Sequence, residues 1–215
     1  MVRCSACGHG PLNSLLCPHC GAPQAVEVDC FAALGIPRKL VIDTRRLERI
    51  YHELSRKLHP DRFAARGVQL RDASLKSTAL LTRAYRTLRD PVARGRYWLE
   101  LLGEKLGDNN RVPPGLAATV FQVQEELEEL REAHSTGAGR VAELVAGVAK
   151  CRKDLEVQLG KELAALEENF MRWDENGSQD RTPLIAALKE RLSRIAYLKT
   201  LVRDVEHHLE EAAPA

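Results

Sequence analysis

Apolar residues recur at helical spacing through most of the chain after Asp29, and this periodicity constrains the fold more than any other feature. In residues 44–58, for example, one helix face would carry Leu47, Ile50, Tyr51, Leu54 and Leu58. No segment shows the alternation of β-branched and polar residues that predicts a sheet. We therefore expect an all-α protein.

Proline, glycine and asparagine divide this helical part into segments. The expected helices cover about residues 29–35, 44–58, 70–88, 91–102, 115–134, 138–173 and 182–211. Residues 59–68 are expected to form a loop, because Pro60 ends the preceding helix. The stretch Gly103–Pro114 is the expected linker between domains. Beyond it, long helices with short connections predict an antiparallel three-helix bundle over residues 115–213.

Residues 1–28 have no helical period and cannot bury a core of their own. They hold two Cys-x2-Cys pairs separated by nine residues: Cys4, Cys7, Cys17 and Cys20. Two such turns can place four thiolates around a tetrahedral zinc, and a closed four-ligand site leaves no position for substrate. We predict one structural zinc; a redox dithiol or free cysteines are the alternatives.

The other cysteines and nearby histidines have simpler interpretations. With four cysteines available, His9 and His19 are expected to stay outside the metal site. Cys30 and Cys151 fall in predicted helices without a partner, as buried small side chains do. Thiol ligands persist in a reducing compartment, and the N-terminal residues match neither a signal peptide nor a transit peptide. We therefore expect a cytoplasmic protein.

Charge is distributed unevenly although the formal net charge is only +2. Residues 43–66 hold seven Lys/Arg against four Asp/Glu, and residues 117–134 hold five Glu against one Arg. Residues 1–28 are neutral and lack the basic cluster that a nucleic-acid-binding zinc protein needs.

No apolar run approaches the roughly 20 residues that cross a bilayer. A zinc hydrolase using His59 or Asp61 is disfavoured, because a four-cysteine site has no open coordination position.

The tripeptide His59-Pro60-Asp61 follows a helix whose outer face is basic and precedes a second long helix. The basic residues are Arg45, Arg49, Arg56 and Lys57. Residues 29–104 resemble the J domain, which implies docking of this helix and tripeptide on a DnaK-type chaperone and activation of its ATPase, with no catalysis by the protein itself. Basic residues can steer an acidic partner. The alternative is a capping loop in an unrelated bundle.

Other segments of the chain narrow the resemblance from J domains in general to one family of J proteins. Asp29–Pro37, Leu58–Phe63, Arg94–Gly103 and Arg194–Leu198 resemble HscB, the J protein dedicated to iron-sulfur cluster assembly. A zinc knuckle is found in the mitochondrial-type members of that family. The resemblance implies two partners, an HscA-type chaperone and an iron-sulfur scaffold protein. A general J protein that delivers unfolded chains is the alternative function.

The resemblance also implies a client-binding face on the helix over residues 115–134. Its candidates are Val120, Phe121, Gln124, Glu125 and Glu128. Gln124 stands where the family pattern has leucine. Val120, Val123 and Leu127 could instead belong to the bundle core, because they recur at helical spacing.

Overall fold

The computed structural model describes residues 3–10, 13–107, 112–113, 115–136, 139–177 and 180–212. Its helices are α1 (Cys30–Leu34), α2 (Thr44–Leu58), the 3-10 helix η1 (Pro60–Phe63), α3 (Val68–Arg89), α4 (Pro91–Leu101), α5 (Ala117–Thr136), α6 (Val141–Glu175) and α7 (Thr182–Glu211). Within the described residues the fold is all-α, as predicted, without a sheet.

The chain divides into two compact units, residues 1–98 and 99–215. The division falls inside α4, ahead of the linker expected over residues 103–114. Residues 108–111 and 114 of that linker lie outside the described residues.

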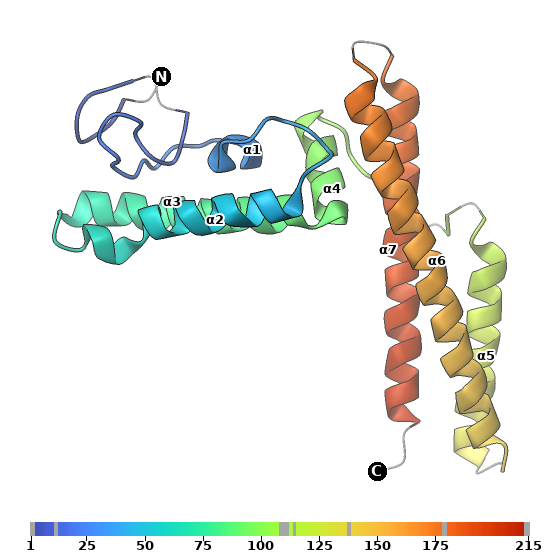
Figure 1. The fold of residues 1–215 in the computed structure, drawn as a ribbon. Coiled ribbons are helices and arrows are strands. Elements are labelled where there is room, and N and C mark those ends of the chain that lie inside the picture. The colour runs from blue at the N-terminus through green and yellow to red at the C-terminus, as the bar shows by residue number, and fades with distance from the viewer. Residues whose placement is uncertain are drawn as a thin grey trace. The chain divides into compact units, whose positions relative to one another are not determined.

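In the first unit, α2 and α3 form an antiparallel hairpin, and α1 packs against α3 (Figure 1). The rings of Tyr51 in α2 and Tyr85 in the last turns of α3 stack with their centroids 4.2 Å apart, which joins the two long helices. Leu47 and Leu58 are buried on the hairpin side of α2, as the periodicity predicts. The expected loop after α2 is partly helical, because Pro60 has a fixed φ suited to the first position of η1.

The short helix α1 is held at both ends. The side chain of Asp29 accepts the backbone N–H of Ala32 at 2.8 Å and so caps the start of the helix, and Gly35 ends it. The backbone N–H of Cys30 donates to the hydroxyl of Tyr97 in α4 at 2.9 Å. Cys30 is buried, as expected of a small side chain without a partner cysteine.

In the second unit, α5, α6 and α7 pack as the expected three-helix bundle, with α6 and α7 side by side over most of their length (Figure 1). Their shared core contains Leu116, Val120, Val123, Leu130, Val148, Cys151, Leu155, Leu198, Leu201 and Val205. The carboxylate of Glu162 on α6 is buried and accepts hydrogen bonds from Arg191 and Arg194 of α7. A buried carboxylate must keep its cationic partners, so this contact fixes α7 against α6.

Candidate functional sites

The tripeptide His59-Pro60-Asp61 lies where α2 ends and η1 begins. The Nδ1 atom of His59 accepts the backbone N–H of Asp61 at 3.3 Å and lies 3.5 Å from its carboxylate. The two side chains are 57% and 89% exposed. Both polar groups therefore face solvent from a turn whose backbone is fixed by proline.

The base of this turn is rigid. The carbonyl of Leu58, which α2 itself leaves without a helical donor, accepts hydrogen bonds from the hydroxyls of Ser74 and Thr78 on α3. Leu58 and Phe63, on either side of the tripeptide, are buried. Because the neighbours are anchored in the hairpin, an exposed tripeptide is presented in one orientation.

The predicted basic residues of α2 are all exposed: Arg45, Arg49, Arg56 and Lys57. The three arginines are spaced four and seven residues apart, so they lie on one stripe of the helix. Lys57 differs, because its ammonium group pairs with the carboxylate of Glu53 at 2.6 Å. The three arginines therefore present positive charge along one exposed stripe of α2.

The two cysteine pairs adopt the same local fold. The N–H of Cys4 donates to the carbonyl of His9 at 2.8 Å, and the N–H of Cys17 donates to the carbonyl of Ala22 at 2.9 Å. Gly8 and Gly21 follow the second cysteine of each pair with a φ of 70° in both. This left-handed conformation strains any residue with a Cβ, so glycine is required at both turns.

The four sulfur atoms converge. The Sγ atoms of Cys4 and Cys20 are 3.6 Å apart, those of Cys7 and Cys17 are 3.8 Å apart, and all four lie within 4.8 Å of one another. Four sulfurs at about 2.3 Å from a tetrahedral zinc lie about 3.8 Å apart. The cluster could thus hold a metal ion, and its geometry fits zinc.

Electrostatics at the cluster also suit a cation. Burial raises the pKa of Cys4, but the backbone N–H groups of Ala6 and Cys7 outweigh it and lower the pKa to about 6. The N–H of His9 lowers the pKa of Cys7, yet desolvation and the neighbouring sulfurs raise it to about 12. Four adjacent thiolates repel one another, so all four can be charged together only around a cation.

The exposed rings of His9 and His19 stack on each other with centroids 5.4 Å apart.

The candidate client face on α5 divides in two. Phe121 is 74% exposed, and Gln124, Glu125 and Glu128 are exposed beside it. Val120 is only 7% exposed and packs in the bundle core with Val123, as the alternative interpretation of their spacing predicts. Helical geometry explains the difference, because adjacent residues point about 100° apart. Phe121 is thus the exposed apolar side chain of this candidate face.

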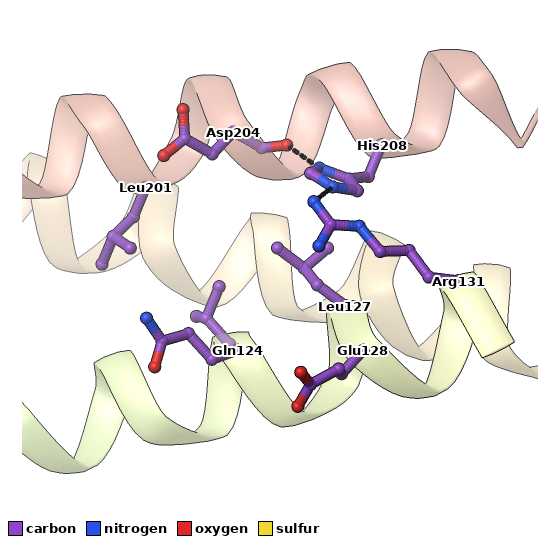
Figure 2. A pocket seen from close by; sticks show the side chains of 8 residues that line it. Gln124, Leu127, Glu128, Arg131, Leu201, Asp204 and His208 are labelled. Atoms are coloured by element: carbon purple, nitrogen blue, oxygen red, sulfur yellow. Dashed lines mark hydrogen bonds between the residues drawn. The ribbon is translucent and has the colours of Figure 1, made fainter.

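A groove of about 540 Å³ runs beside this face, between α5 and α7 (Figure 2). It is lined by Val123, Gln124, Leu127, Glu128, Arg131, Leu201, Asp204 and His208. The Nδ1 atom of His208 hydrogen-bonds the backbone carbonyl of Asp204 at 2.7 Å, and its Nε2 atom meets Arg131 from α5. No motif in the sequence marks the α7 residues Leu201, Asp204 and His208 as part of this site. Their spacing of three and four places them on one face, but spacing alone does not show that α5 lies opposite.

Comparisons with known proteins agree with this architecture, although no family model matches. The chain is 32% identical over 149 residues to the human protein "Iron-sulfur cluster co-chaperone protein HscB", a match covering 66% of this chain and 63% of the human one. It thus spans less than two thirds of that relative. It is 26% identical over 196 residues to the mouse protein of the same name, covering 85% and 84%.

Two solved structures share the fold. One is the crystal structure of human co-chaperone protein HscB, with a TM-score of 0.65, 23% identity, and coverage of 96% of this chain and 98% of that one. The other is chaperone HscB from Vibrio cholerae, with a TM-score of 0.62, 21% identity, and coverage of 86% and 100%. No helix among the described residues is long and apolar enough to span a membrane.

Both sequence relatives are named as co-chaperones, and the two solved structures share the fold of this chain. More narrowly, the chain belongs to the HscB iron-sulfur cluster co-chaperone family, with a four-cysteine cluster near its N-terminus.

Proposed function

We propose that this protein activates the ATPase of a DnaK/HscA-type chaperone through His59-Pro60-Asp61 and delivers an iron-sulfur scaffold protein to it during cluster assembly. The observation that carries the chaperone half is the exposed tripeptide on a rigid base, beside the arginine stripe of α2. The stripe attracts an acidic chaperone surface and orients the encounter, while the tripeptide makes the contact that couples docking to ATP hydrolysis.

The client half of the proposal rests on Phe121 and the carboxylates around it. An exposed aromatic ring surrounded by acidic side chains suits an apolar pocket with a basic rim. The groove between α5 and α7 extends this surface with an apolar floor at Val123, Leu127 and Leu201. In this proposal Phe121 supplies the desolvated contact, and Glu125 and Glu128 fix its register.

The metal of the four-cysteine cluster is, in this proposal, one structural zinc ion. All four coordination positions belong to cysteines, so zinc would stabilise residues 1–28 and perform no chemistry on a substrate. The cytoplasm stays the predicted location, because ligand thiols require a reducing compartment.

One experiment tests both halves. The ATPase rate of the partner chaperone is measured with this protein, with an iron-sulfur scaffold, and with both together. The proposal requires stimulation by the protein alone and a further increase with the scaffold. No stimulation would reject the chaperone half. Stimulation that rises with denatured model chains and not with the scaffold would identify a general J protein instead.

A further inference from the structure

Gln24 is a buried polar residue that the function described above does not use. It follows the second cysteine pair and is 4% exposed. Its carboxamide nitrogen donates to the Sγ atom of Cys4 at 3.3 Å and to the carbonyl of Ala22 at 2.9 Å. A carboxamide nitrogen has two hydrogens, so both are used.

The backbone of Gln24 is held as well. Its N–H donates to the carbonyl of Leu15 at 2.9 Å, and its carbonyl accepts the hydroxyl of Ser77 on α3 at 2.8 Å. Ser77 is fully buried. This one residue thus contacts a cysteine of the cluster, the segment between the two cysteine pairs, and the helical hairpin.

The same turn of α3 holds the end of α2. Ser74 and Thr78, three residues before and one residue after Ser77, donate to the carbonyl of Leu58. Leu58 directly precedes the exposed tripeptide. Hydrogen bonds from one turn of α3 therefore reach Gln24, which contacts Cys4, and also the carbonyl of Leu58 at the base of the tripeptide.

We propose that Gln24 is a positioning residue for the metal site: its carboxamide orients Cys4, and its carbonyl ties the cluster to α3, so that metal occupancy stabilises the base of the tripeptide. A metal-bound thiolate accepts a hydrogen bond more strongly than a thiol. Without the metal, Cys4 is free to move, and the buried carboxamide loses a partner that it cannot replace from solvent. The segment then detaches more readily from Ser77.

The inference rests on the proposed metal binding, and three variants of the full chain test it. Gln24→Met keeps the size of the side chain but removes both donors. Ser77→Ala removes the tie to α3 and leaves the bond to Cys4. Gln69→Met, at an exposed position of α3, is the matched control.

The first measurement is zinc affinity, determined by competition with a chromogenic chelator. Outer-shell partners of metal ligands typically change metal affinity by about 10- to 100-fold, so Gln24→Met should bind zinc at least about tenfold more weakly. Ser77→Ala should lose less, and Gln69→Met should match wild type. In the cobalt-substituted protein, loss of the N–H···S bond should move the thiolate-to-cobalt charge-transfer band to longer wavelength in Gln24→Met alone, a change that a general loss of stability does not produce.

The second measurement is amide hydrogen exchange at residues 58–63, with zinc and after its removal. Removing zinc should speed exchange there in wild type and Gln69→Met. In Ser77→Ala, exchange should be fast in both states because the tie is already broken.

Equal zinc affinity and cobalt spectra in wild type and Gln24→Met would overturn the inference, as would exchange at residues 58–63 that ignores zinc in wild type. These results differ from failure of the metal proposal, in which wild type binds neither zinc nor cobalt.

Discussion

Truncating Phe121 to alanine separates client binding from stability. A phenylalanine exposes about 200 Å² when fully accessible, and this residue is 74% exposed, so about 150 Å² is available for a partner. At about 25 cal/mol per Å², burying that area contributes at most about 4 kcal/mol. Two effects reduce this value: ordering the ring costs entropy, and the alanine side chain still buries part of the area. We therefore expect Phe121→Ala to lose about 1–3 kcal/mol of binding free energy, or roughly 5- to 150-fold in affinity for the scaffold.

The neighbouring residue supplies the matched control. Val120 lies in the bundle core, and Val120→Ala removes two methyl groups worth about 1.6 kcal/mol of transfer free energy, plus a cavity contribution. That variant should melt several degrees lower and bind the scaffold nearly as well as wild type while folded. Phe121→Ala should melt within about a degree of wild type, because the ring is mostly in solvent already.

Calorimetric titration of the scaffold, with a melting curve for each protein, measures both quantities. ATPase stimulation without scaffold should be unchanged in Phe121→Ala, because the ring belongs to the second unit and the tripeptide to the first. Wild-type scaffold affinity in Phe121→Ala would refute the reasoning. The reasoning would also be refuted if Phe121→Ala lost affinity but its melting temperature fell as far as that of Val120→Ala.

Three further predictions concern the first unit. His59→Gln and Asp61→Asn should each abolish ATPase stimulation with unchanged circular dichroism, because both side chains are exposed; full stimulation by either variant would contradict the proposed role. Zinc analysis of protein purified without added metal should give about one ion per chain, and Cys4→Ser should speed proteolysis within residues 1–25 while the helical signal persists; a zinc content near zero would reject the site. Burial raises the pKa of Asp29, but the N–H of Ala32 and the guanidinium of Arg38 outweigh it and lower that pKa below its usual value. The stabilisation is present above the unfolded pKa of about 3.9 and is lost as the pH falls through the folded value, so Asp29→Asn should flatten the acid limb of urea unfolding measured between pH 5 and 2.

The local features of this protein could be predicted from sequence. The cysteine cluster depends on two short turns whose spacing, with a glycine after each pair, specifies convergence of the sulfurs. The ends of α1 follow from Asp29 and Gly35, and the bounds of α7 coincide with those expected. Each of these features involves residues close together in the chain, where capping and turn chemistry act directly.

The three-helix bundle could be predicted, but which individual side chains the neighbouring helices cover could not. Val120 and Phe121 are both apolar and adjacent, and only the arrival of α6 and α7 decides which of them is buried. The groove beside Phe121 could not be predicted for the same reason. Its residues Leu201, Asp204 and His208 lie about 80 positions after Gln124 in the sequence, and only the packing of α7 against α5 brings them together. The contacts of Gln24 could not be predicted from sequence either, because its partners Cys4 and Ser77 lie 20 and 53 residues away.

The two proposed docking surfaces lie in different units of the chain and carry opposite charge. The arginines of α2 face solvent in the first unit, whereas Glu125 and Glu128 face solvent on α5 in the second. A partner acidic enough to be attracted to α2 is repelled from α5, and a basic client is repelled from α2. In the proposed function, opposite charge on separate units therefore prevents the two partners from competing for one surface, so that both can be bound at once.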